Sequence, residues 1–368
     1  MNRIRIFIIF SAVAIITAAS SISTLAQPPR EQPDRTIDAA TRAEIIESVF
    51  KRLNDLYVFP EVAQNMEKSV RERMGKKEYD QTTSAAGFAD MLTKHLREVS
   101  KDKHLGVRYS YETLPAFGER DEPSAEERER FRQFGRRINY GFEKVERLNG
   151  NIGYLDLRGF FDAEAGGDTV TAAMNFLSNT DALIIDLRQN GGGDPAMVQL
   201  ISTYLFRGEP IHLNSLYWRP GNRTQEFWTL PYVAGKRFAD RDVYVLTSNR
   251  TFSAAEEFSY NLKNLKRATI IGETTGGGAH PDRGVRLSDH FQMFVPTGRA
   301  INPVSKTNWE GTGVKPDIEV PAAEALNTAY LSALNKAVEK TTDAVLKSNL
   351  QREIEKVRKE MSQLKDKK

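Results

Sequence analysis

An almost continuous apolar run at residues 182–187, Ala-Leu-Ile-Ile-Asp-Leu, constrains the fold of this chain more than any other feature. Apolar residues in succession, without alternation, are typical of a strand that is covered on both faces. Similar runs occur at 243–246 and 268–271, and helical segments are expected at about 195–205 and 254–265. Strands that alternate with helices in this way predict an α/β architecture.

The residues before this core follow a helical pattern. Apolar residues recur at helical spacing over 45–56, and Pro60 ends the run. Two further helices are expected near 61–75 and 85–98. We therefore predict a small helical domain over residues 37–100.

The α/β core is predicted to cover residues 104–322, beginning with a strand at 106–109. The highly charged stretch 117–137 suits a solvated loop or an exposed helix. Residues 324–368 are predicted to form a charged C-terminal helix. A run of charge is more often a solvated face than a docking surface, although docking of a partner on this helix is an alternative.

The first 26 residues have the three parts of a secretory signal peptide. Arg3 and Arg5 precede an apolar run over 6–18, and small and polar residues follow up to Ala26. The run is shorter than the roughly 20 apolar residues that a membrane span needs. We therefore expect cleavage after Ala26, a periplasmic or secreted location and no stable membrane span in the mature chain. An uncleaved N-terminal anchor is the alternative.

Composition limits the chemistry that the chain can carry. The absence of cysteine excludes disulfides, thiolate metal sites and a thiol nucleophile. Lys and Arg number 52 and Asp and Glu 49, and this near balance argues against a nucleic-acid binder. The five histidines lack the paired spacing of a metal site, so no metal and no cofactor are expected. Hydroxyl, imidazole and carboxylate groups remain.

Three stretches place small residues at predicted strand ends: Asp-Leu-Arg-Gln-Asn-Gly-Gly-Gly at 186–193, Thr-Ser-Asn-Arg-Thr-Phe-Ser-Ala-Ala-Glu-Glu at 247–257, and Gly-Glu-Thr-Thr-Gly-Gly-Gly at 272–278. Glycine turns can expose backbone N–H groups, and Ser253 stands where a helix begins. Together these are the parts of an acyl-transfer site. Taken alone, Ser253 and Glu256 form a helix-capping box, and each glycine turn is only a turn.

These stretches precede Glu-Gly-Thr-Gly-Val-Lys-Pro-Asp at 310–317, and in this order they resemble peptidase family S41 over about residues 40–322. That family contains the tail-specific (C-terminal processing) proteases, the tricorn core protease and the interphotoreceptor retinoid-binding protein modules. The resemblance implies a ClpP/crotonase-like α/β core preceded by a helical domain. It also implies a serine-type peptidase that hydrolyses peptide bonds through an acyl-enzyme.

Two departures from the processing proteases indicate a branch of the family. Their Ser–Lys members place a lysine in the glycine turn after Gly-Glu-x-Thr, and no lysine occurs here between Lys266 and Lys306. The residues from Tyr109 to Gly141 are too few for their PDZ domain. Both features favour the tricorn-like and retinoid-binding-protein-like branch, which resembles this chain in lacking that domain.

The resemblance implies a role for each matching residue. Ser253 is the expected nucleophile, and His104, in an Asp-x-His element, is the expected base. His280 is the alternative base, and Lys103 stands where tricorn has a serine before its histidine. Glu310 is expected to orient the base network. The alternative is that it is only a carboxylate on a surface turn.

Backbone groups and neighbouring residues complete the expected site. The N–H groups that should receive the oxyanion belong to Ala254, Gly191 and Gly192. The residues expected to bind substrate are Gly276, Gly277 and His280. A hydrophobic subsite, or simply packing, is expected of Trp218, Phe227 and Trp228.

A peptide or protein is the expected partner, and a homo-oligomer is left open. The competing function is that of a non-catalytic S41-like protein that binds a hydrophobic small molecule or a peptide. The set of Ser253, His104 and Glu310 favours the enzyme.

Overall fold

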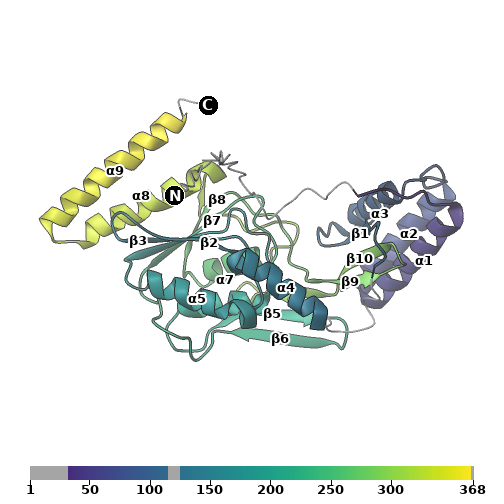
Figure 1. Cartoon of the computed structure of the whole chain (residues 1–368), viewed down its shortest axis with the longest axis horizontal. Helices are drawn as coiled ribbons and strands as arrows, with labels where there is room; N and C mark the ends of the chain where they lie inside the picture. The colour runs from purple at the N-terminus through teal and green to yellow at the C-terminus, as the bar shows by residue number, and fades with distance from the viewer. Residues whose placement is uncertain (1–31, 115–124, 366–368) are drawn as a thin grey trace, which may run out of the picture. The chain divides into compact units, whose positions relative to one another are not determined.

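A six-stranded sheet forms the centre of the α/β core (Figure 1). The computed structural model describes residues 32–114 and 125–365. The strand order is β12-β8-β7-β4-β3-β2, with parallel pairing throughout except for the antiparallel pair β2–β3. The strands are β2 (Phe142–Leu148), β3 (Ile152–Leu157), β4 (Ala182–Asp186), β7 (Asp242–Thr247), β8 (Thr269–Gly272) and β12 (Ile318–Glu319).

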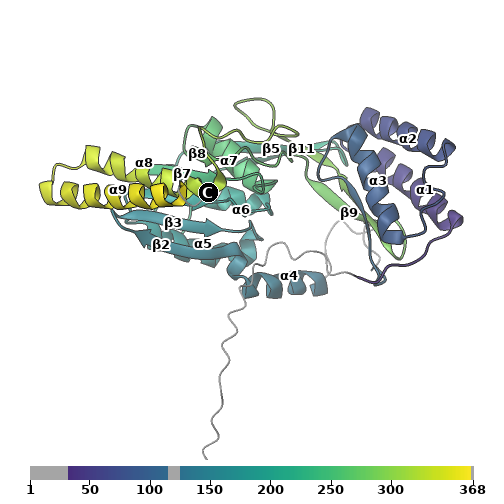
Figure 2. The same ribbon diagram turned by 90° about the horizontal axis from the view of Figure 1, so that it is seen from above.

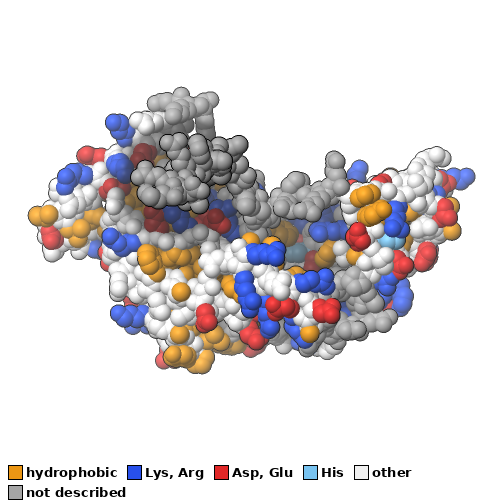
Figure 3. All heavy atoms as spheres, in the orientation of Figure 1, with side chains coloured by type: hydrophobic (Ala, Val, Ile, Leu, Met, Phe, Trp, Pro, Cys, Tyr) orange, Lys and Arg blue, Asp and Glu red, His pale blue; other side chains and the backbone are white. Residues whose placement is uncertain are grey.

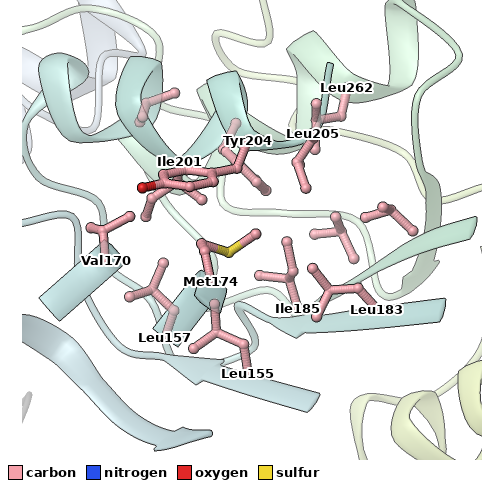
Figure 4. Packing of buried hydrophobic residues seen from close by; sticks show 14 of the residues in the cluster. Leu155, Leu157, Val170, Met174, Leu183, Ile185, Ile201, Tyr204, Leu205 and Leu262 are labelled. Atoms are coloured by element: carbon pink, nitrogen blue, oxygen red, sulfur yellow. The ribbon is translucent and has the colours of Figure 1, made fainter. Parts of the chain in front are cut away.

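One face of this sheet is covered by three helices. Leu183 and Ile185 of β4 pack against residues from all three, as Figure 4 shows for Met174, Ile201 and Leu262. Tight interdigitation of such side chains is what gives a core its density. The helices are α5 (Ala163–Leu177), α6 (Pro195–Tyr204) and α7 (Ala254–Asn264).

The opposite face is covered by the C-terminal part of the chain. Ile184 of β4 points to this face and belongs to a cluster with residues of α8 (Ala322–Lys340) and α9 (Ala344–Lys365). A strand buried on both faces explains the uninterrupted apolar run and confirms the α/β class. The sequence had predicted one helix over 324–368, but residues 341–343 separate two, and α9 lies along α8 (Figure 2).

A second, three-stranded antiparallel sheet has the order β11-β5-β6. Its strands are β5 (His212–Trp218), β6 (Arg223–Trp228) and β11 (Gly298–Ile301). Leu216 and Phe227 from this sheet join Trp309 in a small apolar cluster. This cluster lies beside α7 through the partly buried Tyr260.

The N-terminal region is helical, as predicted, with α1 (Ala39–Leu56), α2 (Pro60–Gly75) and α3 (Ala85–Ser100). Its apolar core is completed by a sheet of order β1-β10-β9, in which β1 (Gly106–Tyr109) pairs antiparallel with β10. Strands β9 (Asp282–Arg286) and β10 (Phe291–Pro296) come from a much later part of the chain. Figures 1 and 2 draw this group of helices and strands together.

The charged stretch expected at 117–137 is an exposed helix over its described part, α4 (Ala125–Arg137). Lys and Arg side chains mix with Asp and Glu over the visible face in Figure 3. Among the described residues, no helix is both long and apolar enough to span a bilayer. The predicted signal peptide, residues 1–26, lies outside the described residues.

Candidate active site

Ser253 lies between β7 and α7 in a backbone conformation that few residues other than glycine adopt. Its φ is 55° and its ψ is −120°. Such a conformation costs about 1–3 kcal/mol and also occurs in serine nucleophiles at sharp strand-to-helix turns. Gly192 makes room for it, because a Cβ on Gly192 would lie 2.8 Å from Ser253 Cβ. The serine is thus held in a strained turn at the positive end of α7.

Glu256, one turn into α7, anchors this strained turn. Its Oε2 accepts the N–H groups of Ser253 and Gly278, both at 2.9 Å. Its Oε1 accepts the Gly277 N–H at 2.6 Å and the Thr275 hydroxyl at 2.5 Å. Burial raises the pKa of Glu256, and these four hydrogen bonds act in the opposite direction. Glu256 therefore caps the helix and also joins the serine turn to the glycine turn.

His104 faces Ser253 from the segment that joins α3 to β1. Its Nε2 lies 3.1 Å from Ser253 Oγ, and its ring packs on Phe252 at a centroid distance of 4.7 Å. Burial lowers the pKa of His104 to about 4, and the negative charge of Asp102 offsets only part of this shift. The imidazole is therefore neutral at pH 7 and can accept a proton from serine. Of the two candidate bases, it is the one beside Ser253.

His280 belongs to a second buried group. Its Nδ1 lies 2.8 Å from Asp102 Oδ2 and 3.4 Å from Glu310 Oε2. The Tyr57 hydroxyl donates to Asp102 Oδ2 at 3.2 Å. Burial raises the pKa of Glu310 to about 7, with His280 acting in the opposite direction. His280 is thus held between two carboxyl groups.

Asp102 connects this group to the histidine beside the serine. Its Oδ1 accepts the backbone N–H of His104 at 3.0 Å, while its Oδ2 faces His280. Glu310 contacts His280 and accepts the Ala279 N–H at 2.5 Å. His104 Nδ1 and Glu310 Oε1 are both buried and make no hydrogen bond within the described residues. Glu310 therefore lies next to the base network without a direct bond to the His104 ring.

The same group is the arrangement that could hold a metal ion among the described residues. Asp102, His280 and Glu310 each offer one ligand atom, and these atoms lie within 4.8 Å of one another. Imidazole and carboxylate groups are ligands that zinc accepts. The hydrogen bonds described above already use His280 Nδ1 and Asp102 Oδ2. These bonds account for the grouping of the three residues.

Two turns contribute backbone N–H groups to the cavity beside the nucleophile. Ala254 and Gly193 line the cavity beside the serine, whereas Gly191 and Gly192 do not. The Gly192 N–H donates to Asn190 Oδ1 at 2.9 Å. Within the described part of the chain, the N–H groups of Gly193 and Ala254 make no hydrogen bond. Gly193 is thus the glycine of this turn that lines the cavity with an unbonded N–H, while Gly191 and Gly192 stay a sequence prediction as oxyanion donors.

The cavity beside Ser253 has a volume of about 400 Å³. Strands β5 and β6 contribute Trp218 and Phe227 to its wall, whereas Trp228, 41% exposed, does not line it. Gly278 and Ala279 line the cavity from the glycine turn. The residues expected to bind substrate, Gly276, Gly277 and His280, do not line it. The N–H groups of Gly276 and Gly277 donate to Thr251 O and Glu256, and His280 Nδ1 lies against Asp102.

Sequence reasoning gave no role to three residues of this site. Asp102 stands two residues before His104 in the same quoted element, and Gly193 ends the same glycine turn as Gly192. Glu257 follows the capping glutamate directly and lines the cavity. Each of the three residues lies in or beside a motif that the sequence analysis quoted, and this position was the signal that could have identified them.

Two family profiles match separate parts of the chain. The profile of peptidase family S41 matches residues 151–320, which contain Ser253 and Glu310. The profile of the N-terminal domain of peptidase S41 in eukaryotic IRBP matches residues 37–133, which contain His104. Together the two profiles include the residues that form the site.

Curated relatives align over about half of this chain. Carboxyl-terminal-processing peptidase 1 of Arabidopsis thaliana chloroplasts is 26% identical over 182 residues, which are 49% of this chain and 36% of that protein. The carboxy-terminal-processing protease of Bartonella bacilliformis is 28% identical over 181 residues, 47% and 40% of the two chains. The tricorn protease of Thermoplasma volcanium is 30% identical over 202 residues, 53% of this chain and 18% of the protease. This chain thus spans two fifths or less of each relative.

Solved structures share the fold over a larger part of the chain. A candidate peptidase from Parabacteroides merdae matches with a TM-score of 0.55 and 20% identity, covering 76% of this chain and 90% of the other. A lipoprotein from Streptococcus agalactiae matches with a TM-score of 0.51 and 16% identity, covering 80% and 96%. The predicted fold class, an α/β core with a helical N-terminal region, is confirmed. On the two profiles, the processing and tricorn relatives and this fold, the chain belongs to peptidase family S41.

Proposed function

We propose that this protein is a serine peptidase that cleaves peptide or protein substrates through an acyl-enzyme on Ser253. The observation that carries the proposal is the 3.1 Å approach of His104 Nε2 to Ser253 Oγ at a strained helix N-terminus. A nucleophile within hydrogen-bond reach of a neutral base is the arrangement that acyl transfer needs. The processing peptidases among its relatives support the same reaction class.

The first half of the reaction forms the acyl-enzyme. His104 Nε2 takes the proton of Ser253 Oγ as the oxygen attacks the peptide carbonyl carbon. The carbonyl oxygen becomes an oxyanion and receives the N–H groups of Ala254 and Gly193, both of which line the cavity. The C–N bond then breaks, and the imidazolium returns its proton to the leaving amine. A water molecule completes the cycle by the same route, with His104 as base.

Asp102 and Glu310 act through their neighbours. The Asp102 carboxylate fixes the backbone of His104 and favours the charged imidazole, so it stabilises the imidazolium that forms during attack. Glu310 holds His280 and the Ala279 N–H in place. Both are positioning residues. We include in this proposal a processing role like that of the relatives. We also include an extracytoplasmic location, which rests on the predicted signal peptide at residues 1–26.

A fluorophosphonate probe tests the nucleophile directly. We expect the folded protein to carry one adduct on Ser253, and Ser253→Ala to lose both the adduct and peptide hydrolysis. Ser348→Ala, which changes an exposed serine on α9, should label like the unchanged protein. Peptidase activity that survives in Ser253→Ala would overturn the assignment. A folded protein that does not label would favour the binding function considered from the sequence.

A further inference from the structure

The cavity beside Ser253 contains a carboxyl group that the proposed reaction does not use. Glu257 lies in the first turn of α7, four residues after Ser253, and both residues line the cavity. Glu257 lines the cavity although it is only 4% exposed. Its Oε1 is buried and has no hydrogen-bond partner among the described residues. A buried carboxyl oxygen without a partner is costly to keep, and such groups call for an explanation.

The surroundings of Glu257 do not satisfy it. Burial raises the pKa of Glu257 to about 8, while the nearby amides of Asn214 and Asn261 act in the opposite direction. Asn214 is itself fully buried, and neither polar atom of its side chain makes a hydrogen bond within the described residues. The protein thus keeps one buried carboxyl oxygen without a hydrogen bond, on a residue that lines the cavity beside the nucleophile.

The rest of the cavity combines apolar walls with negative charge. Trp218, Phe227 and Trp309 form aromatic walls. Asp194 and Asp282 are the other carboxyl residues that line the cavity, and no Lys or Arg is among the described residues that do so. Asp194 Oδ1 is already engaged in capping α6 at the Ala196 N–H, at 2.7 Å. Asp282 is exposed, whereas Glu257 is buried and has one oxygen without a hydrogen bond within the described residues. Glu257 is therefore the buried carboxyl group that is left to meet a ligand.

We propose that this cavity binds the lysine or arginine side chain of the substrate residue whose carbonyl Ser253 attacks, with Glu257 as its counter-ion. The inference rests on the proposed peptidase function. Gly193 and Ala254, the two oxyanion donors, line the same cavity, so a side chain adjacent to the attacked carbonyl starts at its rim. The aliphatic stem would lie along the aromatic walls, which can also contact the cation.

The chemistry favours a cation over other side chains. When the cation enters, Glu257 gives up its proton to solvent and forms a charge-assisted pair. A neutral side chain of the same length leaves the buried carboxyl without a partner, and an acidic side chain adds repulsion. Sites built around a buried polar group reject analogues that lack the matching group far more strongly than apolar pockets do.

Matched fluorogenic peptides test this inference. They differ only at the residue whose carbonyl is attacked, which is lysine, arginine, norleucine or glutamate. We expect kcat/KM for lysine and arginine to exceed that for norleucine by about 10–100-fold at pH 7, and glutamate to be the poorest. In Glu257→Gln the lysine-to-norleucine ratio should fall to within about 3-fold of 1. Glu319→Gln, an exposed glutamate on β12, should keep the ratio of the unchanged protein.

Binding separates this inference from the proposed function. Ser253→Ala protein is titrated with uncleaved peptides in two buffers of different ionisation enthalpy. We expect tighter binding of the lysine peptide than of the norleucine peptide, with release of a proton that Glu257→Gln abolishes. Equal binding of the two peptides, or a lysine preference that persists in Glu257→Gln, would overturn the inference. Failure of the probe to label Ser253 together with a Glu257-dependent preference would remove the peptidase proposal and leave only the binding of a cationic side chain by Glu257.

Discussion

The carboxylate of Glu256 accepts the backbone N–H of Ser253 at 2.9 Å and so fixes the backbone of the nucleophile. The same carboxylate binds the N–H groups of Gly277 and Gly278. One buried side chain thereby fixes two turns relative to each other. The glycine turn in turn lies against His104, so the position of the base depends on the residue that caps the helix of the nucleophile.

Glu256→Gln should destabilise the protein and remove its activity. A glutamine offers one acceptor oxygen and one NH₂ group, which would meet backbone donors that now bind a carboxylate. We expect a loss of about 2–4 kcal/mol in the free energy of unfolding, since hydrogen bonds to charged groups contribute about 1.5–3 kcal/mol each. Urea denaturation measures the loss, and Glu355→Gln on the exposed side of α9 is the control. Equal stability of the two variants would contradict the anchoring role.

Gly278→Ala should displace the base. A Cβ at this position would lie 2.6 Å from His104 Cε1 and would also overlap the Phe252 ring. A shift of about 1 Å in a catalytic group can lower the rate about 100-fold, so we expect a loss of that order in kcat/KM. Gly208→Ala is the control, because no heavy atom lies within 4 Å of its Cβ. A Gly278→Ala enzyme with full activity would show that the His104 position is not required.

The rate of fluorophosphonate labelling should fall at acid pH with a midpoint near 4. Only neutral His104 can accept the proton, and its pKa is lowered to about 4, so the base stays competent well below its ordinary range. Asp102→Asn removes a charge that raises this pKa, so the midpoint should move to lower pH. The maximal rate should fall as well, because the imidazolium loses its stabilising neighbour. A midpoint near 6.5, or an upward shift in Asp102→Asn, would contradict the assignment.

Glu257→Gln should gain stability, relative to the unchanged protein, as the pH rises. The pKa of Glu257 is raised to about 8 in the folded state, so its contribution is present at acid pH and is lost as pH rises from about 4.5 through 8. The variant has no such group. We expect the difference in unfolding free energy to change by up to about 1.4 kcal/mol per pH unit across that window. Denaturant titrations at pH 5 and pH 8 measure it, and a difference independent of pH would show that Glu257 is not held protonated.

The middle of the central sheet could be predicted because β4, β7 and β8 are apolar runs. The edge strands β2 and β12 had no such signal. The run at 182–187 is apolar on both faces, and the structure places helices on both. The pairing of β1 with β10 had no such signal, because these short strands meet across nearly two hundred residues of chain. Both strands pack against α1–α3 in one apolar cluster, and this packing leaves no local pattern in the sequence.

The candidate site could be predicted to the level of motifs but not of contacts. Ser253 and His104 stand in recognisable elements, yet their approach depends on how two distant segments pack. Within the glycine turns, the pattern of glycines did not reveal which N–H groups are already engaged. Gly192 donates to Asn190, and Gly277 and Gly278 both donate to Glu256. Gly193 and Gly278 are the glycines of the two turns that line the cavity.

The pairing of β1 with β10 also determines when the site can assemble during synthesis of the chain. The sheet next to His104 cannot form until residues 282–296, which follow Ser253 in the chain, have been translated. A growing chain therefore carries its serine and its histidine without the scaffold that brings them together. The peptidase that we propose would become competent only once residues 282–296 had emerged from the ribosome.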